Sequence, residues 1–202
     1  MTTLERIAST AALIVICMML IATATPVRAA DMRDIEMVNA FWNDTIHPTE
    51  DISTHGKDHW QSPAESWKRK TGDCDDYAIA KYYTLLALGV PVKALQLANV
   101  VHTVNGKPGL HLVLFYTDER GTWVLDNIAQ DIMLLKQRWD IKHVMAVYDN
   151  KGTHWLGIRP TKIHTPEMWK AMQANTAKHI ADAKAAYNTR PYKTATLTYV
   201  PY

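Results

Sequence analysis

One segment of the sequence, residues 73–88, constrains the fold more than any other. Its apolar residues lie on most sides of a predicted helix rather than along one stripe, and a helix of that kind has to be buried. The segment also has clear ends, because Gly72 precedes it and Gly89 and Pro91 follow it. The sequence therefore predicts a central helix around which the rest of the chain packs.

The flanking segments predict helices before this central helix and strands after it. Residues 33–46 carry apolar positions at helical spacing, and Ser62, Pro63 and Glu65 form a helix start with a capping box. Stretches rich in β-branched and aliphatic residues predict strands over residues 92–101, 110–116, 122–127, 143–148 and 155–158, followed by a long amphipathic helix over 166–187. Helices followed by an antiparallel meander indicate an α+β fold.

Length and charge exclude several classes of protein. The chain has 202 residues, which suits one domain with a substantial core. Its 22 basic and 20 acidic residues give a net charge of +2, too balanced for a protein that binds nucleic acid by neutralising phosphates. The sequence also has no run of five basic residues, which argues against docking on an anionic lipid surface.

The N-terminal segment is expected to be removed from the mature protein. Residues 11–24 form an uncharged apolar run, shorter than the about 20 residues that a membrane span needs and typical of a signal-peptide core. Pro26 and the small residues near Ala29 follow it. We expect a signal peptide over residues 1–29, a single domain over 30–202 and a periplasmic location. The alternative is an uncleaved membrane anchor.

The cysteine content points to a reactive thiol. Of the two cysteines, Cys17 lies in the expected signal peptide, so Cys74 would have no intramolecular partner in an oxidising compartment. Residues 72–77 read GDCDDY, which places Cys74 in the first turn of the central helix. Free N–H groups and the helix dipole stabilise a thiolate there. We interpret Cys74 as a nucleophile; the alternative is a buried cysteine that acts as a small apolar residue.

A thiol nucleophile needs a base, and the predicted strands supply a candidate pair. His111 begins an aliphatic strand, and Asp126 lies on the strand expected to return through a turn at residues 118–121. In such a hairpin the two residues are cross-strand or diagonal neighbours, so Asp126 can orient the His111 imidazole. The alternative is a half-buried histidine and a separate turn residue. His102 is a rival base, but it lacks a carboxylate at a comparable pairing distance.

Several ordered blocks of the sequence together resemble one known family. They span roughly residues 35–160 and comprise VN at 38–39 with Asn43, DHW at 58–60, SPAE at 62–65, GDCDDYAIAK at 72–81, LGVP at 88–91, HLVL at 111–114 and VLDN at 124–127. In these blocks the chain resembles the bacterial transglutaminase-like cysteine proteinases, the LapG-type periplasmic proteases. The resemblance implies a papain/transglutaminase-like fold, with N-terminal helices and the cysteine at the start of a buried helix packed on an antiparallel sheet. It also implies a Cys–His–Asp triad, which falls on Cys74, His111 and Asp126.

The same resemblance implies that calcium is bound by the acids flanking the cysteine, here Asp73 and Asp75, the second of which is often Glu in the family. A physical reason supports this: carboxylates beside a thiol oppose its ionisation, and a divalent cation would cancel their field. Backbone carbonyls or the loop 47–61 would have to complete a shell of about six to eight oxygens. The alternative makes Asp73 a helix cap, with Asp76 at the third helical position, and Asp75 an acid that stabilises the helix dipole.

Three functions follow from these residues. The first is a periplasmic cysteine endopeptidase, a hydrolase. The resemblance implies that it processes a large surface adhesin during biofilm control and is restrained by an inner-membrane receptor that responds to cyclic di-GMP. The second is acyl transfer to an amine, as in transglutaminases, and the third is a calcium-dependent binding module without activity. The intact set of Cys74, His111 and Asp126 favours an enzyme over the third function.

The sequence leaves the donors of an oxyanion hole open. The backbone N–H of Cys74 is the first candidate. An upstream indole, Trp42 or Trp60, or the amide of Asn43 is a candidate for the second. The two tryptophans are equally suited to the core.

Overall fold

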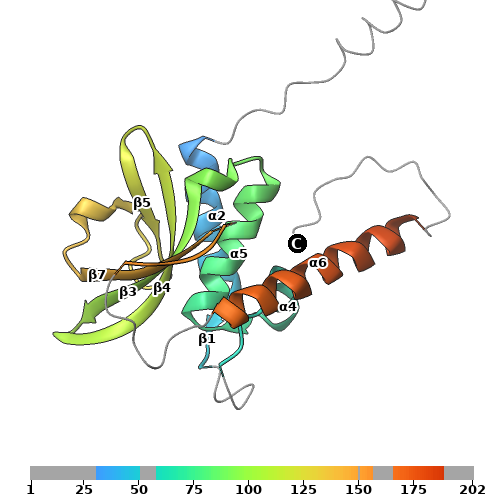
Figure 1. Ribbon diagram of the computed structural model, residues 1–202, viewed down its shortest axis with the longest axis horizontal. Helices are drawn as coiled ribbons and strands as arrows, with labels where there is room; N and C mark the ends of the chain where they lie inside the picture. Colours follow the sequence, from blue (N-terminus) through green and yellow to red (C-terminus); the bar gives the residue numbers. More distant parts are fainter. Residues whose placement is uncertain (1–30, 51–57, 150, 157–165, 189–202) are drawn as a thin grey trace, which may run out of the picture.

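The computed structural model describes residues 31–50, 58–149, 151–156 and 166–188, and the predicted signal peptide lies outside them. Helices pack against a six-stranded antiparallel sheet (Figure 1), which confirms the predicted α+β fold. The helical elements are α2 (Met32–Thr45), α4 (Pro63–Arg69), α5 (Cys74–Ala87), η1 (Val92–Ala94), η2 (Leu135–Gln137) and α6 (Pro166–Asn188). The strands are β1 (His47–Pro48), β2 (Thr71–Gly72), β3 (Leu95–Val104), β4 (Lys107–Asp118), β5 (Gly121–Leu125), β6 (Met133–Leu134), β7 (Ile141–Asp149) and β8 (Gly152–Trp155). Among the described helices, none combines the length and apolar character needed to cross a membrane.

β3 and β4 form a long hairpin at the centre of the sheet. They join through Asn105 and Gly106, whose φ angles of 51° and 77° are those of a tight hairpin turn. The hairpin is longer than predicted, because the expected strands over 92–101 and 110–116 stop short of this turn. The extra length matters for the site, since it pairs His102 with Gly109 in the same ladder that carries His111.

The order of the strands differs from a simple meander. The sheet runs β6-β5-β4-β3-β7-β8, so β7 pairs with β3 instead of following β6. The chain leaves β6 through η2 and crosses to the free edge of β3, where the N–H of Thr103 donates to the carbonyl of Asp140 at 2.8 Å. A strand has the same hydrophobic alternation on either edge of a sheet, so the sequence pattern does not record this crossing.

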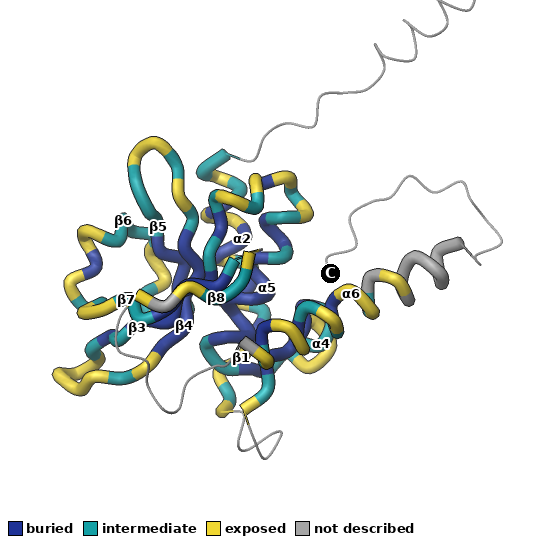
Figure 2. Tube along the Cα trace, viewed as in Figure 1, coloured by how far each residue is buried: buried dark blue, intermediate teal, exposed yellow. Residues whose placement is uncertain are grey.

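α5 lies at the centre of the molecule, as the sequence predicts. Most of its residues are buried (Figure 2), and its Ile79 and Leu85 share the main core with Leu112 and Leu114 of β4. A second, smaller core lies on the other face of the sheet and consists of Ala98, Val100, Val113, Phe115, Val124 and Val147. The central hairpin is therefore packed on both faces, which fixes its register.

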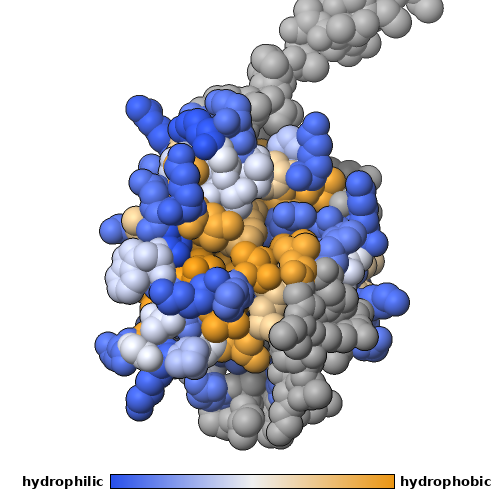
Figure 3. Space-filling view, turned by 60° about the vertical axis from the view of Figure 1, so that its left-hand side comes forward, coloured by the Kyte–Doolittle hydropathy of each residue, from blue (hydrophilic) through white to orange (hydrophobic). Residues whose placement is uncertain are grey.

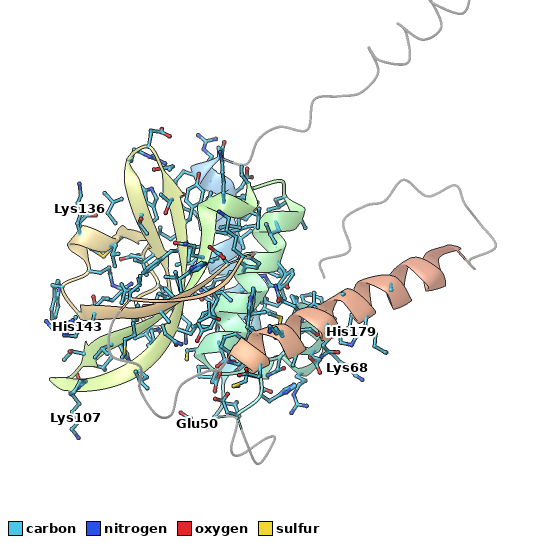
Figure 4. The ribbon with its side chains drawn as sticks, viewed as in Figure 1. Glu50, Lys68, Lys107, Lys136, His143 and His179 are labelled. Carbon is cyan, nitrogen blue, oxygen red and sulfur yellow. The ribbon has the colours of Figure 1, made fainter. Side chains whose placement is uncertain are left out.

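α4 and α6 cross near the start of α4. Ser62 caps α4 as predicted, and its N–H donates to Glu65 Oε2 at 2.8 Å. α6 packs against this capped end: His179 Nδ1 lies 2.8 Å from Ser62 Oγ, and Asn175 Nδ2 donates to Glu65 Oε2 at 2.8 Å. Figure 4 labels His179 at this crossing. Trp169, from the first part of α6, enters the main core.

Candidate active site

The backbone that leads into α5 is fixed by a buried carboxylate in the first turn of the helix. β1 and β2 form a short parallel ladder immediately before this point. Asp76 Oδ2 accepts a hydrogen bond from the N–H of Asp73 at 3.2 Å, and Asp76 Oδ1 accepts one from the N–H of Gln61 at 2.8 Å. Asp76 is fully buried, as is expected for a group with a structural role. The positions of Asp73 and Asp76 confirm the predicted helix start.

Gly72 makes room for this arrangement. A Cβ atom at this position would lie 2.7 Å from Asp76 Cβ and 2.9 Å from Asp76 Cγ. Either distance would force Asp76 away from Asp73 and Gln61. Glycine is required here because of this close approach to a buried side chain.

Cys74 is the first residue of α5, but its thiol does not have the low pKa that this position predicts. Burial is the main reason why the pKa of Cys74 is raised to about 12, and the carboxylates of Asp73 and Asp76 also raise it. A hydrogen bond from the backbone of Leu112 lowers this pKa, but by less. A helix N-terminus typically contributes about 0.3–1 kcal/mol, which does not offset these effects. The helix start alone therefore does not provide a thiolate, in line with the expectation that carboxylates beside the thiol oppose its ionisation.

His111 and Asp126 form the pair that the sequence predicts. The ladder between β4 and β5 aligns Leu114 with Leu125, so Asp126 follows directly after β5 and faces His111. His111 Nε2 lies 2.7 Å from Asp126 Oδ1, and the two side chains are 3% and 0% exposed. Because Nε2 is taken by the carboxylate, Nδ1 is the nitrogen of His111 that can accept a proton.

Cys74 and this pair belong to one site. Leu112, which supplies the backbone hydrogen bond that lowers the pKa of Cys74, is the residue after His111 on β4. The Asp126 carboxylate is close enough to raise the same pKa. The structure thus places the Cys74 thiol against β4, next to the residue that follows His111, and within electrostatic range of the Asp126 carboxylate.

The main chain of Asp126 is held by Asn43, which the sequence analysis named only as a possible oxyanion donor, and by Lys81, to which it gave no role. The Asp126 carbonyl oxygen accepts a hydrogen bond from Asn43 Nδ2 at 2.9 Å and another from Lys81 Nζ at 3.1 Å. Lys81 is fully buried, and this burial lowers its pKa to about 7, although the nearby Asp126 acts in the opposite direction. A lysine inside an otherwise apolar helix is a signal that could have identified it.

The side chain of Asp126 is held by Arg138, a residue that the sequence analysis did not single out. Arg138 Nη2 donates to Asp126 Oδ2 at 2.7 Å, and the N–H of Ile128 donates to Oδ1 at 2.9 Å. Burial by itself would raise the pKa of Asp126, but the hydrogen bonds from His111, Ile128 and Arg138 hold it well below its usual value. Asp126 is therefore ionised. An isolated arginine in a loop gives no sequence signal for such a contact.

The rival base, His102, also lies in the site. Its ring stacks on that of His111, with centroids 4.6 Å apart and an interplanar angle of 28°. Burial lowers the pKa of His102, and the neighbouring His111 lowers it further. Among the described residues, none places a carboxylate within hydrogen-bond distance of His102, in agreement with the sequence analysis.

Two of the three suggested side-chain donors for an oxyanion hole have other partners. The Trp42 indole N–H donates to Thr84 Oγ1 at 2.9 Å, and the Asn43 amide donates to the Asp126 carbonyl. Trp60 is buried in an aromatic cluster with Tyr148 and Trp169. The backbone N–H of Cys74, at the first position of α5, has no partner within the helix and stays available.

The acids that flank Cys74 fit a hard cation. One ligand atom from each of Asp73, Cys74 and Asp75 lies within 4.8 Å of the other two. Burial raises the pKa of Asp75 well above its ordinary value, and a hydrogen bond with Asp73 raises it further. Two carboxyl groups this close need a proton or a cation between them. Their oxygen atoms suit calcium or magnesium, whereas the thiol sulfur does not.

A cysteine at the start of a buried helix, packed on an antiparallel sheet that carries a histidine paired with an aspartate, is typical of transglutaminase-like cysteine peptidases. Residues 17–163 match the family model described as bacterial transglutaminase-like cysteine proteinase. This match covers most of the chain, so the chain belongs to the bacterial transglutaminase-like cysteine proteinases. Among curated proteins, none matches the chain significantly.

Solved structures of LapG from Legionella pneumophila are similar to this chain. Calcium-bound LapG is 29% identical, with a TM-score of 0.58 over 70% of this chain and 77% of LapG. EGTA-treated LapG is 29% identical, with a TM-score of 0.57 over the same shares. A further LapG structure is 30% identical, with a TM-score of 0.56 over 70% of this chain and 76% of LapG. These likenesses agree with the family and with the predicted transglutaminase-like fold.

Proposed function

We propose that the chain is an endopeptidase with a Cys74–His111–Asp126 triad. The observation that carries this proposal is the buried 2.7 Å contact between His111 Nε2 and Asp126 Oδ1, which leaves Nδ1 to serve the thiol. The thiol proton moves to Nδ1 as Sγ bonds to the peptide carbonyl carbon. The imidazolium then gives this proton to the leaving amine as the C–N bond breaks. Water hydrolyses the resulting thioester, with His111 again as the base.

We propose that Asp73 and Asp75 hold calcium. Their buried, closely spaced carboxylates support this, and so does the similarity to LapG, which is known in calcium-bound and EGTA-treated forms. A bound divalent cation would offset the negative charge that Asp73 places beside Cys74 and so lower the pKa of the thiol. The remaining oxygen ligands would come from the backbone or from water.

We propose a periplasmic location and a large surface adhesin as the substrate, with control by an inner-membrane receptor that responds to cyclic di-GMP. The location is supported by the signal-like run over residues 11–24, and the substrate and receptor by the resemblance to LapG-type proteases. Exposed apolar residues also lie beside the site in sequence, namely Ile128 after Asp126 and Trp139 after Arg138. Apolar side chains gather on the face shown in Figure 3, which suits an extended protein segment.

The experiment that tests the proposed function compares the wild-type protein with Cys74→Ser. Purified fragments of a large surface adhesin from the same bacterium are incubated with each, with and without a fluorescent primary amine. We expect the wild type alone to produce a new N-terminus, at an unchanged rate when the amine is present. Incorporation of the amine would instead indicate acyl transfer, and cleavage by Cys74→Ser at the wild-type rate would remove Cys74 as the nucleophile. Cell fractionation tests the location.

A further inference from the structure

Arg138 lies between two carboxylates, and one of them belongs to the proposed triad. Arg138 Nη2 is 2.7 Å from Asp126 Oδ2 and 2.6 Å from Asp140 Oδ2, and Arg138 Nε donates to Asp140 Oδ1 at 2.8 Å. The Arg138 side chain is 2% exposed, whereas that of Asp140 is 22% exposed. A buried guanidinium with this geometry is held in one orientation by both acids.

Four side chains therefore form a row of alternating charge that starts at the proposed base. In order they are His111, Asp126, Arg138 and Asp140, and each contact between neighbours is 2.7 Å or shorter. His111 becomes positive when it accepts a proton. The negative charges of Asp126 and Asp140 favour this protonated state, whereas the positive charge of Arg138 opposes it. Such effects are strong in a buried site because water screens them little.

We propose that Arg138 and Asp140 are positioning residues that set the proton affinity of His111 through Asp126. This inference rests on the proposed triad. Arg138 holds Asp126 Oδ2, so that Oδ1 stays directed at His111, and it offsets part of the negative charge that the imidazolium feels. Asp140 in turn offsets part of the charge of Arg138.

Other charged or titratable groups face the same pair from the neighbouring elements. His102 of β3 stacks on His111, and Lys81 of α5 donates to the Asp126 carbonyl. Cys74, with the acids beside it, lies at the start of α5 and feels the Asp126 charge. All of these groups stay unchanged when residues 138 and 140 are replaced. Differences between the variants therefore report the two proposed residues.

A purely structural role for Arg138 makes a different prediction. Arg138 and Asp140 also fasten the chain that crosses to β7, where the Asp140 carbonyl accepts the N–H of Thr103. If fastening were their only role, both replacements would loosen the same segment and would change His111 in the same way. If they act by charge, removing the positive and the negative member must have opposite effects.

The test is an NMR titration of the His111 imidazole in protein labelled at histidine, with Cys74→Ala in every variant so that the thiol does not exchange a proton with the imidazole. We expect Arg138→Gln to raise the pKa of His111 and Asp140→Asn to lower it, each by about half a pH unit or more. Arg138→Lys, which keeps the charge, should stay nearer to the parent. Asp140→Asn keeps the shape and a hydrogen-bond acceptor, so it isolates the charge.

The matched control is the pair of Arg120, whose side chain is half exposed, and Asp118, where Arg120 Nε donates to Asp118 Oδ2 at 3.0 Å. Arg120→Gln should leave the His111 titration unchanged. Shifts in the same direction for Arg138→Gln and Asp140→Asn, or no shift in either, would overturn the inference. If Arg138→Gln does not fold, the direction in which Asp140→Asn shifts the pKa of His111, compared with the small shift expected for Arg138→Lys, still tests the inference. The titration needs no proteolysis, so its outcome is independent of the adhesin cleavage test.

Discussion

His102 lies against His111, with ring centroids 4.6 Å apart and ring planes inclined by 28°. Two imidazoles at this distance oppose each other's protonation, because a second positive charge would lie beside the first. Among the residues that the structure describes, a carboxylate partners His111 but not His102, since Asp126 Oδ1 is 2.7 Å from Nε2 of His111. Both candidate bases therefore lie side by side, and the contact with Asp126 makes His111 the better placed of the two to accept a proton.

The first prediction separates these two histidines. His111→Ala should lower kcat/KM for peptide cleavage by several orders of magnitude, because it removes the proposed base. His102→Ala should lower it by less than about tenfold, because it removes only a stacked ring. His102→Phe keeps a ring at this position and should be closer to the wild type. If His102→Ala is crippling and His111→Ala is mild, the assignment of the base is reversed.

The second prediction concerns the coupling of His111 and Asp126. Asp126 acts only through the imidazole, so adding Asp126→Ala to His111→Ala should cost little further activity. Asp126→Asn alone should cause a large loss, but a smaller one than His111→Ala. A double-mutant cycle on kcat/KM measures this coupling. Fully additive losses would show that the two residues act independently.

The third prediction concerns the cation and the thiol. The alkylation rate of Cys74 by iodoacetamide follows its thiolate fraction, which is very small at neutral pH while its pKa is about 12. Calcium should raise this rate, and EGTA should reverse the effect. Magnesium should be a poor substitute, because it prefers six ligands and keeps its waters.

Asp73→Asn and Asp75→Asn should each weaken the response to calcium, whereas Glu119→Gln, at the exposed turn between β4 and β5, should not. Labelling is followed by mass spectrometry, with Cys74→Ala as the blank. Alkylation and proteolysis that are both indifferent to chelation in metal-free protein would leave Asp73 and Asp75 as residues of the helix start only.

The fourth prediction concerns the stability of the fold. Buried Lys81 has a pKa of about 7, below its usual 10.5. Between these values the unfolded chain holds a proton at Lys81 that the folded chain has lost, so the contribution of Lys81 to stability should rise with pH, by at most about 1.4 kcal/mol per pH unit. The raised pKa of buried Asp75 acts in the opposite direction. The full penalty of the buried charge is present below about pH 7 and is relieved above it.

Lys81→Met should remove this dependence and raise the free energy of unfolding at pH 6, since Asn43 still donates to the Asp126 carbonyl. Urea unfolding between pH 6 and 9 measures the free energy of unfolding. Above this range, the raised pKa of Cys74 makes stability fall with pH and would mask the effect of Lys81. Lys107→Met, at an exposed lysine, should keep the wild-type slope. An equal slope in Lys81→Met and the wild type would show that Lys81 is not its source.

Much of this architecture could be predicted because local signals and burial agree along the chain. The capping box at Ser62 and Glu65, and the glycines at the two ends of α5, set helix boundaries without help from tertiary structure. The pairing of His111 with Asp126 could be predicted because a hairpin turn and a period of two residues fix which side chains meet.

What the sequence could not give depends on contacts between distant segments. Arg138 reaches Asp126 only because the chain crosses the sheet between β6 and β7, and no local pattern encodes that crossing. The raised pKa of Cys74 also depends on contacts between segments that are distant in the sequence. The helix start is visible in the sequence, whereas the depth at which the thiol is buried becomes visible only when Leu112 and the rest of β4 are in place.

The carbonyl of Asp126 accepts hydrogen bonds from Asn43, 83 residues earlier in the chain, and from Lys81, 45 residues earlier. No fragment of the chain that lacks α2, α5 or β5 can therefore assemble the complete site. The site is complete only when these three elements have packed together. A chain that has not yet packed these elements together carries the same thiol without the complete set of contacts around Asp126.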